Sequence, residues 1–117
     1  MSKKVFVPLT TKFFYQFKNE GKRFELRRLG GPWNTNNIYS SRPVVLSKGY
    51  GKYERIKGII GAVHVGSLNQ IFKIIPYRLI IADAKSKREA IESVELLLGN
   101  SAQFIAFEFI PNKKTGG

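Results

Sequence analysis

The segment "NEGKRFELRR", Asn19–Arg28, brings four cations and two carboxylates together around a single glycine. Its second half alternates, with a phenylalanine and a leucine separated by a glutamate, and this period of two is typical of a β-strand. We therefore predict an extended segment with its apolar side chains toward the core and its charged ones on the other face. Either these charged residues form a solvated turn, or Lys22, Glu25 and Arg27 are directed at a ligand.

The chain before this segment is predicted to form a short strand and a helix. "KVFVPL" is rich in residues that favour strands, and Pro8 should end it because proline has no backbone N–H. Either Thr10 or Thr11 can cap a following helix of about ten residues, and Gly21 is the glycine that commonly follows a last turn. Three aromatic residues share one face of this helix and are assigned to the core: Phe13, Phe14 and Phe17.

The chain after the segment is predicted to be mostly β-structure. A loop over residues 29–42 contains the only tryptophan, Trp33, and is longer than compact domains usually carry without a function. Two strands follow, at 44–47 and 56–65, and Gly58 and Gly61 in the second indicate a bulge or bend. A short helix or turn should precede Pro76, with an extended piece after it.

The C-terminal part contains the clearest helix and a last strand. Apolar residues recur at helical spacing over Lys87–Leu98, and Gly99 closes that helix. "QFIAFEFI" alternates and predicts a strand. We expect an α+β fold: a small mixed β-barrel of about five strands with two or three flanking helices. Residues 1–111 should form one domain, and residues 112–117 a disordered tail.

Composition limits the classes of protein to consider. No stretch approaches the roughly 18 to 20 apolar residues of a membrane-spanning helix, and the first residues are a poor signal peptide, so we expect a cytoplasmic protein with no membrane partner. The chain has no cysteine and one histidine, His64, so we expect no metal site and no cofactor. A formal charge of +12 favours a polyanionic partner.

The segment "GKRFELR" resembles the signature of the ASCH domains, a branch of the PUA-like superfamily. That signature has a lysine, a glutamate three residues later and an arginine two beyond it, and Lys22, Glu25 and Arg27 keep those spacings. Gly21 directly precedes the lysine, whereas the signature places its glycine one residue further back. The order of the predicted elements, from the "KFFYQF" helix to the closing "FIAFEF" strand, is also similar to that family.

The resemblance implies a barrel with a cleft that accepts RNA or a nucleobase. Some ASCH proteins are amidohydrolases of acetylated cytidine, others are ribonucleases, and others are binding modules. In the amidohydrolases a lysine at the Lys22 position acts beside a threonine, but this chain has Glu25 there. They also use a carboxylate before the C-terminal helix, and Asp83 is the candidate for it. Under this hypothesis the catalytic residues are Lys22, Glu25 and Asp83.

The three motif residues also allow an interpretation without the family. A lysine beside a carboxylate and an arginine can present an ammonium of tuned pKa to a ligand, and Arg27 can hold a phosphate through two hydrogen bonds. The alternative is that Glu25 pairs with Arg23 or Arg27 across a solvated strand face, which is worth about 0 to 1 kcal/mol.

Aromatic and basic residues alternate in the loops, as expected where bases stack on rings while cations follow the phosphates. We therefore predict binding of RNA or single-stranded nucleic acid. The predicted nucleic-acid-binding residues are Lys22, Arg23, Arg27, Arg28, Trp33, Tyr39, Arg42, Lys48, Tyr50, Lys52, Tyr53 and Arg55. Two alternatives stay open: a small hydrolase acting on RNA or modified nucleosides, and a basic inhibitor that docks on an acidic protein.

Overall fold

The computed structural model of the protein describes residues 3–51 and 54–112. Two predicted binding residues, Lys52 and Tyr53, and residues 113–117 of the predicted tail lie outside the described residues. Within those ranges, no helix has both the length and the apolar composition needed to cross a bilayer. The elements are β1 (Val5–Leu9), α1 (Thr11–Asn19), β2 (Phe24–Arg28), β3 (Pro43–Lys48), β4 (Arg55–Gly66), α2 (Leu68–Ile74), a 3-10 helix (Tyr77–Leu79), α3 (Lys87–Leu98) and β5 (Phe104–Pro111).

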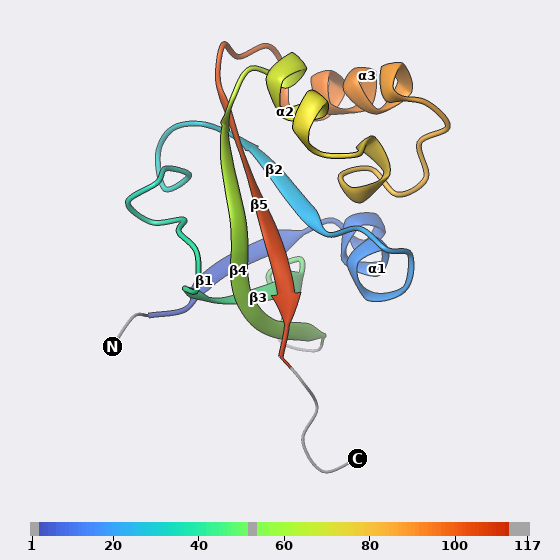
Figure 1. The fold of residues 1–117 in the computed structure, drawn as a ribbon. Coiled ribbons are helices and arrows are strands. Elements are labelled where there is room, and N and C mark those ends of the chain that lie inside the picture. Colours follow the sequence, from blue (N-terminus) through green and yellow to red (C-terminus); the bar gives the residue numbers. More distant parts are fainter. Residues whose placement is uncertain (1–2, 52–53, 113–117) are drawn as a thin grey trace.

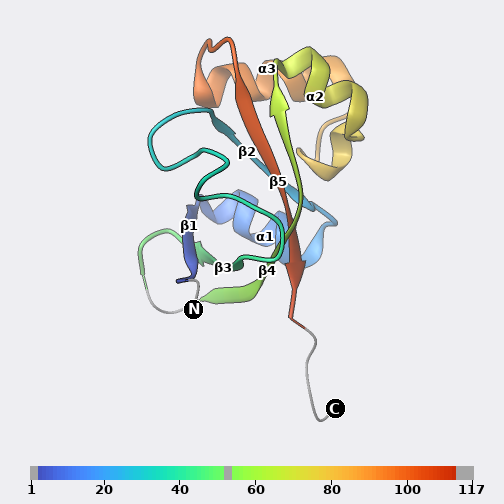
Figure 2. The same cartoon turned by 60° about the vertical axis from the view of Figure 1, so that its left-hand side comes forward.

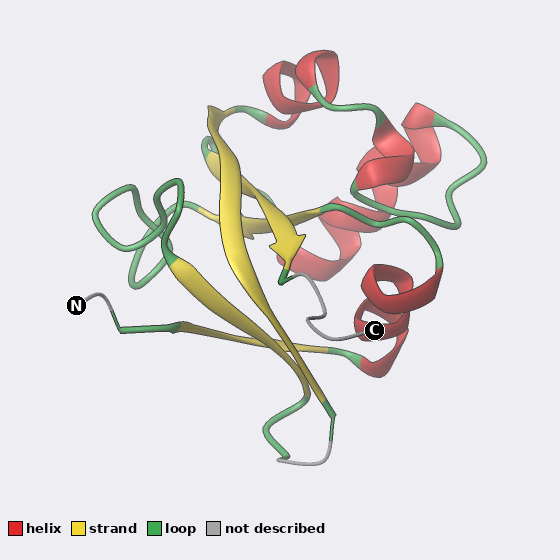
Figure 3. Cartoon of the chain, turned by 60° about the horizontal axis from the view of Figure 1, so that its bottom comes forward, coloured by secondary structure: helices red, strands yellow, loops and turns green. Residues whose placement is uncertain are grey.

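The five strands form one curled sheet, a half-barrel (Figure 1). Their order is β1-β3-β4-β5-β2, in which β1 is parallel to β3 and the other neighbours are antiparallel. The edge strands β1 and β2 meet where Arg27 Nη2 donates a hydrogen bond to the Pro8 carbonyl oxygen at 2.9 Å. The helices, red in Figure 3, pack in two groups: residues of α2 and α3 belong to the core on one face of β5, and Phe14 of α1 belongs to the core on the other face. The predicted α+β class, with a small mixed barrel of five strands and flanking helices, is confirmed.

Strand β5 separates two hydrophobic cores, because successive side chains of a strand point to opposite faces. Phe104 and Ala106 belong to the first core, which includes residues of α2 and α3. Ile105, Phe107 and Phe109 belong to the second core, inside the half-barrel. Helices α2 and α3 lie together near one end of the long strands, and α1 lies further along them (Figure 2).

Helix α1 and the turn after it agree with the prediction. The Thr10 side chain accepts a hydrogen bond from the Phe13 amide, so Thr10 is the N-cap, and the helix ends at Asn19. Gly21 has a φ of +85°, a backbone conformation that residues with a side chain rarely adopt. This turn sends the chain back into β2 and brings Lys22 inward, where its amide donates to the Gln16 carbonyl oxygen at 3.1 Å.

Two sequence predictions are wrong. Pro8 does not end β1, which continues to Leu9; proline is tolerated there because β1 is an edge strand paired only with β3. The residues after Pro76 form a 3-10 helix instead of an extended piece. Of the two alternatives left open for the charged face of β2, the solvated one does not describe Glu25, which is buried together with Phe24 and Leu26.

Candidate functional site

The site lies at the open seam between the edge strands. Antiparallel pairing places Glu25 opposite Phe107 and Arg27 opposite Ile105. Directly paired residues share a face of the sheet, so both charged side chains point to the half-barrel interior. The curl of the sheet therefore turns the charged face of β2 into the wall of a cavity, and a solvated ion pair is excluded as the description of Glu25.

Lys22 is buried, with 4% of its surface exposed. Its ammonium donates to the Ile80 carbonyl oxygen and lies 3.7 Å from Glu25 Oε1. The nitrogen is also 4.9 Å from the Phe13 ring centroid and 5.1 Å from that of Phe17, within cation–π range. A buried ammonium with one carboxylate beside it is a costly arrangement that proteins often keep at functional sites.

Burial lowers the pKa of Lys22 from 10.5 to about 8. Desolvation is the largest cause, because it penalises the charged form, and the nearby Arg27 charge lowers the pKa further. The Glu25 carboxylate acts in the opposite direction by attraction and hydrogen bonding. The side chain can therefore exchange a proton near neutral pH, which an exposed lysine does not do.

Arg27 is held by three partners. Its Nε is 2.8 Å from Glu25 Oε2, and its Nη2 donates to the Pro8 carbonyl oxygen. The guanidinium lies 4.4 Å from the Trp33 ring centroid, and Trp33 in turn stacks on Phe107 at 6.1 Å and 12°. The tryptophan of the long loop thus covers the half-barrel and fixes Arg27, while Arg27 orients Glu25.

A pocket of about 250 Å³ opens beside these residues. Lys22, Glu25 and Arg27 supply its charged groups, and its walls are mostly apolar. A second hollow adjoins the pocket, sharing Arg27 and the end of α3 and adding Arg28, Trp33 and the glycines of the loop. The walls of the pocket come from β1, α1, β2, the 3-10 region and α3, including Leu9, Phe13, Leu26, Ile80, Ile81 and Leu97.

Asp83, the third predicted catalytic residue, lies outside the pocket lining. Its carboxylate is 3.1 Å from Lys12 and accepts a hydrogen bond from Gln16 Nε2 at 3.2 Å. The hydrogen bond from Lys12 is the main cause of its lowered pKa. Among the described residues, no group of three or more acidic, histidine or cysteine side chains is placed to hold a metal.

Sequence reasoning missed Gln16, which is 1% exposed. Its Oε1 accepts from the Ala82 amide at 2.9 Å, and its backbone oxygen accepts from the Lys22 amide. This one side chain therefore ties α1 to the segment that carries the Ile80 carbonyl. The available signal was a polar residue on the phenylalanine-rich face of a predicted helix.

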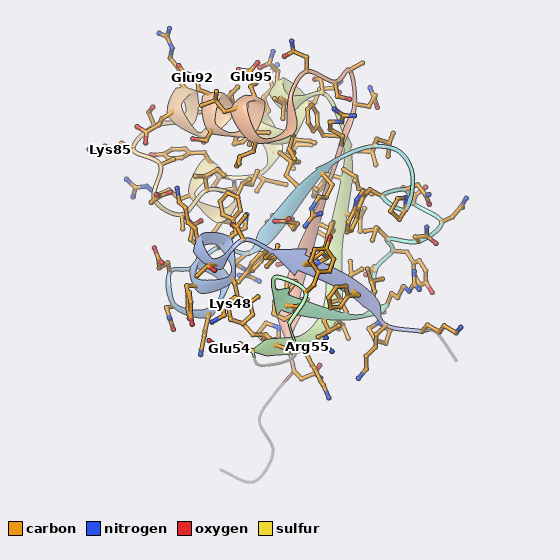
Figure 4. The ribbon with its side chains drawn as sticks, turned by 180° about the vertical axis from the view of Figure 1, so that it is seen from behind. Lys48, Glu54, Arg55, Lys85, Glu92 and Glu95 are labelled. Atoms are coloured by element: carbon orange, nitrogen blue, oxygen red, sulfur yellow. The ribbon has the colours of Figure 1, made fainter. Side chains whose placement is uncertain are left out.

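The structure distributes the other predicted binding residues around the molecule. Arg28 and Trp33 join the site, whereas Arg23 pairs with Glu108 at 2.7 Å and Arg42 lies over Tyr39. Lys48, Tyr50 and Arg55 lie at or beside the β3–β4 connection. Lys48 and Arg55 are at the end of the molecule away from the α3 residues Glu92 and Glu95 (Figure 4).

Comparison with solved structures identifies the fold. The sequence matches no family model and no curated protein. The crystal structure of ASCH from Zymomonas mobilis superposes with a TM-score of 0.60 at 16% identity, covering 95% of this chain and 68% of that chain. This chain has the ASCH fold.

Two further solved structures superpose on this chain along their whole length. The crystal structure of hypothetical protein PH0355 gives a TM-score of 0.75 at 15% identity and covers 94% of this chain and 100% of that one. The solution structure of protein PF0455 from Pyrococcus furiosus gives 0.65 at 19% identity, with 96% and 100% covered. The resemblance found in "GKRFELR" is confirmed at the level of the fold.

Proposed function

We infer that this protein binds RNA or another single-stranded nucleic acid by accepting one base into the pocket beside Lys22. The observation that carries the proposal is a buried donor next to a buried acceptor, Lys22 and Glu25, at a hollow with apolar walls. An unpaired base offers an apolar face and an edge that carries both donors and acceptors. The ASCH fold, with the PUA-like cleft that the resemblance implies, supports the same partner.

Each charged residue has a defined role in this proposal. Glu25 accepts hydrogen bonds from an exocyclic amino group, and the Lys22 ammonium donates to a carbonyl or ring nitrogen of the same edge. Arg27 already uses Nε and Nη2 within the protein, so it orients Glu25 instead of holding a phosphate. Arg28 is exposed in the adjoining hollow and is the residue we assign to the phosphate.

Titration of short fluorescent RNAs tests the proposal. Lys22→Met should weaken binding by about tenfold or more, because a hydrogen bond to a charged group contributes roughly 1.5–3 kcal/mol. Arg88→Gln is the matched control, since it removes one positive charge from an exposed position on α3 outside the pocket. Equal losses for the two variants would show that net charge alone carries the binding and would reject the pocket.

The second candidate function is hydrolysis of RNA or of a modified nucleoside. It is favoured by the lowered pKa of Lys22, because an amine that releases its proton near pH 8 can act as a general base. Against it, Thr10 is the only hydroxyl side chain among the described residues that line the pocket, and that hydroxyl already caps α1. Incubation with acetylated cytidine and with RNA should show turnover that Lys22→Met abolishes; absence of such turnover removes this candidate.

A further inference from the structure

A second basic and aromatic surface lies on the outer face of β1, β3 and β4. Strand register places Phe6 beside Val45 and Lys57, all on the face opposite to the half-barrel interior. Tyr50, in the turn after β3, and Arg55, at the start of β4, adjoin this row. We call the group of Phe6, Tyr50, Arg55 and Lys57 the Phe6 surface.

The rings of the Phe6 surface are exposed and close together. Tyr50 is 83% exposed and Phe6 is 37% exposed, although both could pack in a core. Their ring centroids are 6.2 Å apart at 39°, and the Arg55 guanidinium lies 5.3 Å from the Phe6 centroid. Clustered exposed aromatic residues usually mark a binding site, and a ring with a cation beside it is suited to a stacked base with its phosphate.

The charged residues of the strands under the Phe6 surface have one sign. Strands β1, β3 and β4 contain no aspartate or glutamate, and Lys3 and Lys4 lead into β1. The nearest carboxylate in sequence, Glu54, is engaged by Lys48 at 2.9 Å and Lys18 at 3.2 Å. The hydrogen bond from Lys48 is the main cause of the lowered pKa of Glu54, about 2, so this carboxylate stays ionised and paired with the two lysines. A polyanion is therefore the partner that this surface fits.

Strand β1 links the Phe6 surface to the edge of the pocket. Pro8 is two residues beyond Phe6 on the same strand face and belongs to the pocket lining. Two residues of an extended strand span roughly 7 Å. A nucleic-acid strand whose base enters the pocket would cross the edge of β1 at Pro8 to reach the rings.

We propose that the Phe6 surface binds a second segment of the same single-stranded nucleic acid, stacking a base on Phe6 and Tyr50 while Arg55 and Lys57 contact phosphates. This inference rests on the proposed function for the identity of the ligand, but its residues are separate from the pocket. The ligand that contacts both sites is then a polynucleotide, because a free nucleoside can contact only one of them. An acidic protein would match the cations alone and would gain little from the two rings.

The test compares a long ligand with a short one. Fluorescence anisotropy measures the affinity for an RNA of about twelve nucleotides, a length within the site sizes of single-strand binders. Calorimetry measures the affinity for a mononucleotide. The double variant F6L/Y50L should weaken the long RNA by about fivefold or more, the loss expected for one stacked base, and leave the mononucleotide unchanged. Phe6→Tyr with Tyr50→Phe keeps both rings and should keep the affinity. Leu96→Ala, an exposed apolar residue on α3, is the control.

Each outcome has one meaning. Unchanged affinity of F6L/Y50L for the long RNA overturns the proposal, and so does an equal loss for both ligands, because the effect would then act through the pocket or the fold. Loss of long-RNA binding in F6L/Y50L, with Lys22→Met binding both ligands normally, would support the Phe6 surface and reject the pocket. A wild-type protein that binds neither ligand overturns both proposals.

Discussion

Lys22 shows how position changes the chemistry of an ordinary side chain. The sequence indicated that Lys22, Glu25 and Arg27 act together, and the structure places all three on one pocket. The sequence did not reveal that the Lys22 ammonium is enclosed by Phe13 and Phe17, because that enclosure depends on a helix and a strand that meet only after folding. The lowered pKa is a property of this enclosure.

Folding stability should rise with pH because of Lys22. Its pKa is about 8 in the folded protein against 10.5 ordinarily, so between these values the unfolded chain binds more protons. Stability then increases as pH rises through that window, by at most about 3 kcal/mol. Urea unfolding near pH 7.5 and near pH 10 should show the gain in the wild type and not in Lys22→Met. Because other groups titrate in both proteins, the comparison is between the two gains in stability. An identical gain in Lys22→Met contradicts the assignment.

Arg27 should not tolerate replacement by lysine. A lysine cannot reproduce the two hydrogen bonds to Glu25 and Pro8 or the planar contact with Trp33. We expect Arg27→Lys to lower the free energy of unfolding by about 1–3 kcal/mol, as measured by chemical denaturation. Arg88→Lys changes an exposed pair on α3 and should cost less than about 0.5 kcal/mol. A loss at position 27 no larger than at position 88 would show that the seam contact is unimportant.

At the scale of elements, sequence periodicity predicted the helices and strands whose formation depends on their own residues alone. Helix Lys87–Leu98 and the strand in "QFIAFEFI" follow from local patterns, and the structure contains them as α3 and β5. Of the two residues predicted as alternative caps of α1, Thr10 is the one that caps it. Burial of both faces of β2 could not be predicted, because it results from the curl of five strands. The 3-10 helix after Pro76 was missed, since a proline indicates where a helix stops and leaves the conformation of the next residues open.

The two glycines of β4 should differ in their tolerance to alanine. A Cβ on Gly58 would lie 2.2 Å from the Ile110 backbone oxygen of the paired strand, which cannot move without breaking the ladder. A Cβ on Gly61, in the bulge, would meet mainly the ends of the Glu108 and Ile110 side chains. Gly58→Ala should cost about 1–3 kcal/mol and Gly61→Ala less, as measured by thermal unfolding. The reverse order would contradict the bulge geometry.

For the whole molecule, the charge of +12 is unevenly distributed. Glu89, Glu92 and Glu95 lie on α3, whereas the strands under the Phe6 surface carry no carboxylate. The net charge alone predicted a polyanionic partner, yet it could not separate the pocket from the Phe6 surface. Their separation comes from the alternation of β1, whose inward residues fill the core while Phe6 faces outward.

This distribution predicts how salt acts on binding. If about five phosphates of a single strand are neutralised, the logarithm of the affinity should fall against the logarithm of the salt concentration with a slope near −3.5. Replacing Arg55 and Lys57 by glutamine removes two of those contacts and should reduce the slope by about 1.4. F6L/Y50L should lower affinity without altering the slope, because stacking releases no counterions. Anisotropy titrations at several salt concentrations measure both quantities. A slope that stays the same after loss of both cations would place the phosphates elsewhere on the protein.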